Sequence, residues 1–432
     1  MRVFWDQAGR HGATYLAAEV IAKGGVYVLF VWLATLLTVE GFGLLNVFVS
    51  LLTMVAVVVG LGLPDGLVRF HFGDTDFRAV LALAITLPLA AGLLLFVMVI
   101  PWHTHVAGAL NIPPALLILA VGGAPLVALR QAWLGVLRAR REPGRYLLVR
   151  LLEPFLFLGA IVVLLVGANK VTYVSTAVGY LAAVCGVAIV GFATVASRIG
   201  LQWNTRPLKR MLVFSIPLVA HSLAMTGLGL FDQLVLQQLL GAEITGNYAF
   251  AYRFGMAMSL LVFGFGAAWG PLVFQRLQSG EQATLLPLAR TAFRLLLVSC
   301  VVLSWVLPAV AAWVGGERYS GALHLIPLVV YAYLWLGVYS FAVGHLYFRG
   351  RSASLAAVSG MAFLVNAVLN YLTIPVWGAT AAAATTVISY VLLSVLIWRA
   401  LGTDRSDLPW TEFVFQAIIS APLVLAASFF FA

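Results

Sequence analysis

The segment SRIGLQWNTRPLKR (Ser197–Arg210) is the longest charged stretch between the apolar runs of this chain, with six such runs before it and seven after it. A membrane-spanning helix needs about 20 mostly apolar residues, so each run predicts one span. The predicted spans cover residues 14–37, 44–63, 80–100, 114–135, 151–167, 172–197, 211–239, 247–274, 291–314, 322–348, 354–374, 379–401 and 412–432. The connections between them are too short to hold a soluble domain.

The composition excludes a water-soluble protein. Of the 432 residues, 63% are hydrophobic and 9% are charged, whereas soluble domains have roughly 25% charged residues. Two cysteines, Cys185 and Cys300, are too few for a disulfide scaffold. The first apolar run has full bilayer length and lacks the short apolar region and cleavage site of a secretory signal, so it is predicted to be a retained span.

The distribution of basic residues predicts the orientation. If the N-terminus is cytoplasmic, the inner loops hold twenty of the 25 Lys and Arg residues, and the outer loops hold Lys170 and Arg318. An excess of Lys and Arg in cytoplasmic loops sets the topology of membrane proteins. The net charge of +10 is therefore explained mostly by orientation, and it gives no reason to expect a nucleic-acid partner.

The charged segment divides the predicted all-α protein into two parallel lobes. Residues 1–196 are predicted to form an N-lobe of six spans, 197–210 a cytoplasmic linker, 211–401 a C-lobe of six spans, and 402–432 an extra span. An even number of spans gives both lobes the same orientation. The motif VEGFG (Val39–Gly43) precedes the second span and resembles AEITG (Ala242–Gly246), which precedes the eighth. Parallel repeats with a site at their interface are a common transporter plan.

Five charged residues inside the predicted spans are the candidates for a substrate site. Lys23, Arg130 and Arg253 are basic, whereas Glu19 and Asp232 are acidic. Ionisable groups within a membrane are costly, so they usually face a polar interior or a partner. The basic excess predicts a cavity for an anionic substrate. Arginine suits phosphate, because its planar fork can donate two hydrogen bonds.

The same five residues also allow interpretations without a substrate. Glu19 and Lys23 are four residues apart on one helix face and could form a neutralising pair. Arg253 and Asp232 are predicted at similar depth and could pair across neighbouring helices, or Arg253 could line the cavity. Arg130 could extend its side chain to the inner end of its span.

Polar uncharged residues within the spans give one further candidate for coupling. His221 follows Pro217 by four residues near the middle of the seventh span. It is either a buried, hydrogen-bonded histidine or a group that changes charge during transport. Asn366 and Asn370 share a helix face, which predicts interhelical hydrogen bonds.

Charged residues at the ends of spans are predicted to form interfacial pairs. Arg150 and Glu153 lie at the start of the fifth predicted span and are interpreted in this way.

No motif for catalysis, metal binding or nucleotide binding is present. The chain lacks G-x-x-x-x-G-K-[ST], H-E-x-x-H and paired C-x-x-C sequences. Membrane enzymes that act on lipid-linked sugars usually place acidic residues, His or Arg in a large outer loop. The largest outer loop here, residues 101–113, contains His103 and His105 but no acidic residue or Arg. The sequence therefore predicts a protein that is not an enzyme, without catalytic residues, metal or cofactor.

Several segments resemble a known family. FSIPLVAHSLAMTGLGLFDQLVL (Phe214–Leu236), GAEITGNYAFAYRF (Gly241–Phe254) and AAWGPLVFQR (Ala267–Arg276) resemble the start of the second half of Wzx-like polysaccharide-biosynthesis flippases. These flippases belong to the multidrug/oligosaccharidyl-lipid/polysaccharide (MOP) exporter superfamily. The segments Leu36–Phe70 and Asn366–Tyr390 are also similar, and the resemblance covers most of residues 14–401.

The resemblance implies two six-helix lobes around a central cavity that opens alternately to the two sides of a bacterial inner membrane. Such proteins move a polyprenyl-pyrophosphate-linked oligosaccharide outward for O-antigen, exopolysaccharide or capsule synthesis. The implied partners are this lipid-linked substrate, membrane lipid and other polysaccharide assembly proteins. Family cavities are typically basic, which matches Lys23 and Arg253 and, less closely, Arg130. The resemblance assigns no coupling group, and Glu19, Asp232 and His221 remain the coupling or pairing candidates from the residues themselves.

The predicted thirteenth span is a departure, because family members usually have twelve or fourteen. Residues 412–432 are expected to be an appended helix, a re-entrant segment or the remainder of a final hairpin.

Two other functions fit the sequence. One is an ion-coupled exporter of cationic drugs with the same fold, in which Glu19 and Asp232 carry the site. The other is a membrane enzyme or a scaffold of polysaccharide assembly.

Overall fold

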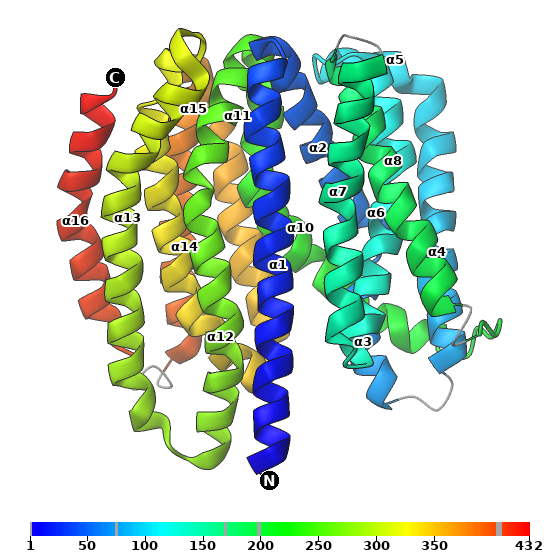
Figure 1. Cartoon of the computed structure of the whole chain (residues 1–432). Helices are drawn as coiled ribbons and strands as arrows, with labels where there is room; N and C mark the ends of the chain where they lie inside the picture. The colour runs from blue at the N-terminus through cyan, green and yellow to red at the C-terminus, as the bar shows by residue number, and fades with distance from the viewer. Residues whose placement is uncertain (1, 74–76, 168–170, 197–199, 403–407) are drawn as a thin grey trace. The chain divides into compact units, whose positions relative to one another are not determined.

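The computed structural model describes residues 2–73, 77–167, 171–196, 200–402 and 408–432, and Figure 1 shows that every regular element among them is a helix. The prediction of an all-α protein is confirmed. Twelve helical segments are long and apolar enough to cross a membrane. Lys170 and residues 197–199 of the predicted linker lie outside the described residues.

One of the twelve segments contains two spans. Ala353–Leu401 has 49 residues, about twice the length that a bilayer requires. It belongs to α15 (Ser352–Leu401), in which Gly378 has φ 59° and ψ −139°. Such backbone angles are essentially restricted to glycine, so the helix is interrupted there. With α15 counted as two helices, the described residues contain the thirteen spans that the sequence predicts.

Hydrogen bonds show that the two halves of α15 form an antiparallel hairpin. Asn366 Nδ2 donates to Ser389 Oγ at 3.1 Å, and Thr385 Oγ1 donates to Asn370 Oδ1. The partner of Asn370 in the second half thus lies four residues before the partner of Asn366, as expected for antiparallel helices. The interhelical role predicted for the two asparagines agrees with this geometry.

The chain divides into two compact units, Met1–Leu29 with Leu44–Thr226 and Phe30–Gly43 with Gly227–Ala432. The divisions fall within three helices, α1 (Arg2–Leu36), α2 (Val39–Val59) and α10 (Leu208–Leu240). Residues 30–43 therefore pack with the second unit, and residues 211–226 pack with the first. This division follows packing, whereas the predicted lobes 1–196 and 211–401 follow the count of spans.

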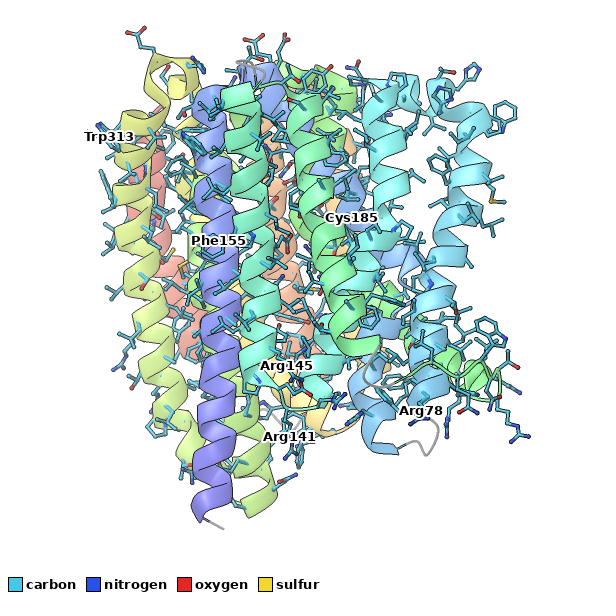
Figure 2. The ribbon with its side chains drawn as sticks, turned by 45° about the vertical axis from the view of Figure 1, so that its right-hand side comes forward. Arg78, Arg141, Arg145, Phe155, Cys185 and Trp313 are labelled. Carbon is cyan, nitrogen blue, oxygen red and sulfur yellow. The ribbon has the colours of Figure 1, made fainter. Side chains whose placement is uncertain are left out.

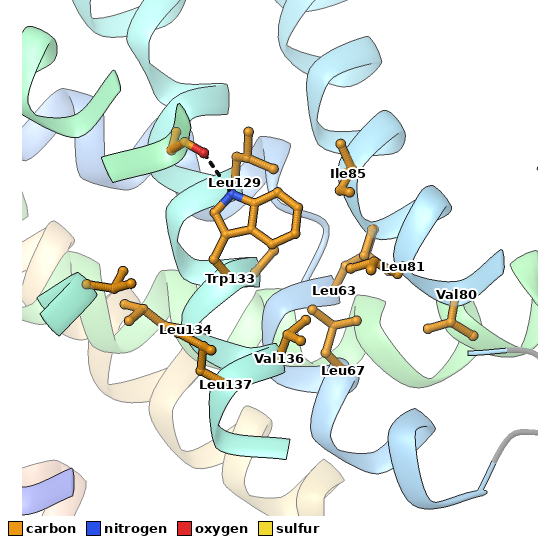
Figure 3. Close-up of a cluster of buried hydrophobic side chains, with 14 of the residues drawn as sticks. Leu63, Leu67, Val80, Leu81, Ile85, Leu129, Trp133, Leu134, Val136 and Leu137 are labelled. Atoms are coloured by element: carbon orange, nitrogen blue, oxygen red, sulfur yellow. Dashed lines mark hydrogen bonds between the residues drawn. The ribbon is translucent and has the colours of Figure 1, made fainter. Parts of the chain in front are cut away.

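The first unit is built around α6. Between α2 and α10, its elements are α3 (Leu63–Gly73), α4 (Phe77–Val99), η1 (Ile100–Trp102), α5 (His103–Ala109), α6 (Pro114–Ala139), α7 (Pro143–Gly167), α8 (Tyr173–Gly191) and the π-helical η2 (Phe192–Ala196). Trp133 of α6 is fully buried among apolar residues that include Leu63 and Ile85, and its Nε1 donates to Ala188 O at 3.2 Å (Figure 3). Helices α3, α4, α7 and α8 all pack against α6.

Three arginines of the first unit lie at one end of it. Arg78 is the second residue of α4, and Arg141 and Arg145 lie around the connection between α6 and α7. Figure 2 shows these three residues at the same end of the unit, whereas Phe155 and Cys185 lie farther along α7 and α8. This is the distribution on which the predicted orientation depends.

The second unit is built around α14. Its elements after α10 are α11 (Ala242–Gly255), α12 (Ala257–Ser279), η3 (Gln282–Thr284), α13 (Leu285–Gly315), η4 (Gly316–Ala322), α14 (Leu325–Phe348), α15 and α16 (Trp410–Phe430). In the apolar window of α14, 83% of the residues are buried, and α11, α12, α13, α15 and α16 all pack against it. A helix that is apolar on every side is suited to this central position.

Two observations agree with an internal repeat of six spans. The central helices α6 and α14 are the fourth and tenth spans, so each has the same place in its half. The two similar motifs also pack reciprocally within the second unit. A Cβ atom on Gly43 would overlap Ala242 O, and a Cβ atom on Gly246 would overlap Val39 O. Such reciprocal contacts are what a two-fold relation between repeats produces.

The last helix, α16, runs from a contact near the start of α13 to a contact just before α14. At its start, Glu412 accepts a hydrogen bond from Arg290 Nε of α13 at 2.8 Å. At its end, Ser428 Oγ donates to His324 O at 2.6 Å, just before α14 begins. Figure 1 shows α16 alongside α13. Of the three expectations for residues 412–432, a full-length appended helix agrees with these contacts and a re-entrant segment does not.

Candidate functional site

Glu19 of α1 is a centre of charge pairing in the first unit. Its carboxylate accepts two hydrogen bonds from the Arg150 guanidinium, from Nε at 2.9 Å and from Nη2 at 2.7 Å. It also accepts a hydrogen bond from the Tyr146 hydroxyl and lies 3.7 Å from Lys23 Nζ. The two-pronged contact with arginine is the geometry that also recognises phosphate.

A second carboxylate extends this pairing toward the core of the first unit. Glu153 of α7 pairs with Arg130 of α6, and its Oε2 lies 3.8 Å from Arg150 Nη1. The Tyr180 hydroxyl of α8 donates to Glu153 at 3.4 Å. Lys23, Glu19, Arg150, Glu153 and Arg130 therefore form a continuous series, which we call the first-unit charge chain. It contains three cations and two carboxylates.

The exposure of the charge chain rises from α6 to α1. The side chains of Arg130, Glu153, Arg150, Glu19 and Lys23 are 8%, 6%, 12%, 29% and 40% exposed. Lys23 is the seventh residue of the apolar segment Ala17–Leu36, about 9 Å from its start by helical rise. Its ammonium is paired with Glu19 at 3.7 Å, as expected for a charge at this depth, because contact with lipid tails is costly.

The predicted pair of Arg150 and Glu153 is present, with Arg150 Nη1 3.8 Å from Glu153 Oε2, but its expected place at the membrane interface is wrong. Arg150 was expected before the fifth span, in an inner loop. Helix α7 begins at Pro143, so Arg150 lies two turns inside it and makes its two-pronged contact with Glu19. The missed signal was Pro143, a residue favoured in the first turn of helices. A helix starting there places Tyr146, Arg150 and Glu153 on one face.

Asp232 of α10 lies in a buried polar cluster of the second unit. It is 1% exposed and accepts hydrogen bonds from the Tyr248 hydroxyl, from Gln233 N at 2.7 Å and from Thr386 Oγ1 at 3.4 Å. Thr386 lies in the second half of α15, so the carboxylate joins α10, α11 and that hairpin. An ionised carboxylate is costly to bury among neutral donors, because neutral hydrogen bonds replace only part of its hydration.

The hairpin supplies further oxygen and amide groups beside Thr386. Asn366, Asn370, Thr385 and Ser389 are all buried and are linked by side-chain hydrogen bonds. Carboxylate, amide and hydroxyl oxygens are the ligands of small hard cations. Among the described residues, no group of three or more His, Cys, Asp or Glu side chains could hold a metal ion.

Arg253 of α11 contacts an aromatic ring of α1. Its guanidinium carbon lies 4.1 Å from the centre of the Phe30 ring, which is within the range of a cation–π interaction. The carboxylate of Asp232, with which Arg253 could have paired, accepts hydrogen bonds from the Tyr248 hydroxyl, the Gln233 backbone N–H and the Thr386 hydroxyl.

The six candidate residues fall into both units. Lys23, Glu19 and Arg130 lie in the first unit and are joined through Arg150 and Glu153. His221 is also in the first unit, half-buried on α10 one turn after Pro217. Arg253 and Asp232 lie in the second unit.

Comparison with protein families gives one match. The sequence model of the family described as "Polysaccharide biosynthesis protein" matches residues 9–278, more than half of the chain. No curated protein sequence matches the chain.

Three solved structures show a similar fold. The lipid II flippase MurJ in an inward closed conformation has a TM-score of 0.71 at 12% identity, over 95% of this chain and 97% of that one. An inward-facing multidrug resistance MATE transporter of the MOP superfamily has a TM-score of 0.69 at 13% identity, over 95% and 98%. A MOP transporter from Pyrococcus furiosus, described as having a binding pocket of reverse polarity, has a TM-score of 0.59 at 13% identity, over 96% of both chains.

Proposed function

Because the chain belongs to the polysaccharide biosynthesis protein family, we propose that it is a flippase for a polyprenyl-pyrophosphate-linked oligosaccharide. It acts in the bacterial inner membrane with a cytoplasmic N-terminus, and its product feeds O-antigen, exopolysaccharide or capsule synthesis. The protein is a multi-pass membrane protein and not an enzyme. The fold shared with MurJ and MATE transporters supports transport by alternating access.

The first-unit charge chain is the observation that carries the choice of an anionic substrate. It has one more cation than carboxylates, and its most exposed member is Lys23. In this state Glu19 occupies the fork of Arg150, as a phosphate oxygen pair would. A pyrophosphate that approached Lys23 would compete with Glu19 for the same donors, since charge-assisted bonds to phosphate and carboxylate share one geometry.

Competition between the substrate and Glu19 could couple substrate binding to a change of conformation. A ligand shifts a conformational equilibrium only by its differential affinity for the two states. Substrate that frees Glu19 from Arg150 loosens the contact of α1 with α7, whereas the empty protein keeps that contact. Arg253 is proposed as the corresponding cation of the second unit, and Arg130 as a residue that positions Arg150 through Glu153.

Asp232 is proposed as the coupling group. It is buried and held by neutral donors, so gain of a proton or a small cation would change the charge of the second unit by one. Glu19 is less suited to this role, because Arg150 already neutralises it. His221 is the remaining candidate in the first unit.

Deletion of the gene in its own host tests the proposed substrate. We expect lipid-linked repeat units to accumulate on the cytoplasmic face, and Lys23→Ala and Arg253→Ala variants to fail to restore surface polymer. Arg141→Ala, at the basic end of the first unit (Figure 2), is the matched control and should restore it. Loss of repeat-unit synthesis instead of translocation would favour an enzyme or scaffold.

A second candidate function is export of cationic drugs by ion coupling. The MATE-like fold and the buried acid Asp232 favour it. Expression would then confer drug resistance that the Asp232→Asn variant abolishes.

A further inference from the structure

The second unit contains a cavity of about 530 Å³ between α14, the second half of α15 and α16. Its lining includes Arg399, Trp398 and Trp410, together with Val395, Val414 and Ile418. None of these residues belongs to the charge chain or to the polar cluster of Asp232. The cavity is therefore a feature that the proposed transport function leaves unused.

The cavity has its one charged residue, Arg399, at one end, and Ile418 and Tyr331 lie at the other. Arg399 is two residues from the end of α15, and Trp410 is the first residue of α16. Ile418 lies eight residues farther along α16, about 12 Å by helical rise. The rings of Trp398 and Trp410 stack with their centres 4.6 Å apart. Tryptophan and arginine at the end of a span are typical of the level of the lipid headgroups.

A lipid fits this arrangement better than a water-soluble ligand. Ile418 is exposed at a depth where an apolar surface meets lipid tails, and the apolar walls continue inward from Arg399. A cation at the mouth of a pocket between membrane helices attracts an anionic headgroup. We propose that the cavity binds one anionic phospholipid, with its phosphate on Arg399 and an acyl chain along Val395, Val414 and Ile418.

The bound lipid would hold the appended helix in place. Helix α16 contacts α14 through a hydrogen bond from the Tyr331 hydroxyl to Ala417 O at 3.0 Å, and it contacts α15 through the stacked tryptophans. The cavity lies among the three helices at these contacts. A lipid there would add apolar contacts with all three helices, so its binding should stabilise the protein.

The experiment uses the purified full-length protein, delipidated in detergent and mixed with phosphatidylglycerol or phosphatidylcholine of identical chains. Bound lipid is counted by native mass spectrometry, and the melting temperature is measured in parallel. We expect phosphatidylglycerol to bind and to raise the melting temperature more than phosphatidylcholine does. Arg399→Gln should weaken phosphatidylglycerol binding about tenfold or more, as expected for loss of a charge-assisted hydrogen bond.

Matched variants separate this site from general effects of charge. Arg349→Gln removes an exposed arginine at the end of α14 that does not line the cavity, and it should leave the difference between the two lipids unchanged. Val395→Trp fills the cavity and should reduce binding of both lipids while the circular dichroism spectrum stays helical.

Three results would overturn the proposal. Equal binding of both lipids by the unmodified protein would remove the role of the headgroup. An equal stabilisation by inorganic phosphate would assign Arg399 to a free anion. If the unmodified protein were a dimer and Val395→Trp a monomer, the cavity would be assigned to a second copy of the chain. None of these outcomes depends on transport of the saccharide.

Discussion

Replacement of Glu153 by Gln tests the buried end of the first-unit charge chain. The side chains of Glu153 and Arg130 are 6% and 8% exposed, so the variant leaves a buried guanidinium without its carboxylate. Removal of one partner of a buried pair costs about 3–5 kcal/mol. The Tyr180 hydroxyl and Arg150 also lose a charged partner, so we expect a loss of at least about 3 kcal/mol in the free energy of unfolding.

Two further variants make the prediction specific. In the double variant Arg130→Met with Glu153→Met, neither charge remains, and replacement of a buried pair by apolar residues is often neutral. Most of the lost stability should therefore return. Glu142→Gln is the matched control, because Glu142 pairs with Arg145, which is 45% exposed. Exposed pairs contribute about 1 kcal/mol or less.

A thiol-reactive dye can report unfolding of the first unit. Val184 of α8 is fully buried, so a cysteine there reacts only when the unit opens. The two native cysteines, Cys185 and Cys300, are replaced by Ala in the same protein. Labelling across a denaturant series gives the midpoint and slope, and hence the free energy of unfolding. If Glu153→Gln loses no more stability than Glu142→Gln, the buried pair and the reasoning based on it are refuted.

Three other predictions follow from the described contacts. Gly246→Ala should destabilise the protein by about 2 kcal/mol or more, because the added Cβ would overlap the backbone of the other repeat motif. Gly264→Ala should be tolerated, because the space around its Cβ is open. Thermal denaturation of both variants checks this. Asp232→Asn should make transport insensitive to imposed proton or sodium gradients in vesicles while the protein stays folded; an unchanged gradient dependence would exclude Asp232 as the coupling group. Glu19→Gln should free the fork of Arg150, so binding of inorganic pyrophosphate, measured by calorimetry, should tighten; weaker binding would contradict competition between Glu19 and the anion.

The spans were predictable because their signal is local. Length and apolar composition decide whether a helix can cross a bilayer, and neither depends on packing. Length and composition also predict the thirteenth span, α16, although they do not predict which helices it packs against. The repeat was visible in the glycines of VEGFG and AEITG, which pack against each other because a side chain at Gly43 or Gly246 would overlap the backbone.

The partners of the charged residues were less predictable because they depend on helix rotation and tertiary packing. Arg150 and Glu19 are 131 residues apart, and neither spacing nor composition connects them. The predicted start of the fifth span was also wrong, and this error excluded Arg150 from the candidate site residues. Arg253 lies over the Phe30 ring. The sequence does not predict this contact, because the apolar runs contain many aromatic residues that could accept a cation.

Transport by the purified protein in vesicles shows whether an anionic headgroup is recognised. The substrate is a short-chain polyprenyl saccharide with a fluorescent label, prepared with a pyrophosphate linkage or with an uncharged linkage of similar length. We expect the pyrophosphate compound to cross the membrane, the uncharged compound not to cross it, and Lys23→Ala and Arg253→Ala to abolish crossing. Equal movement of both compounds, or movement that is unchanged in the two variants, would contradict recognition of an anionic headgroup by these residues.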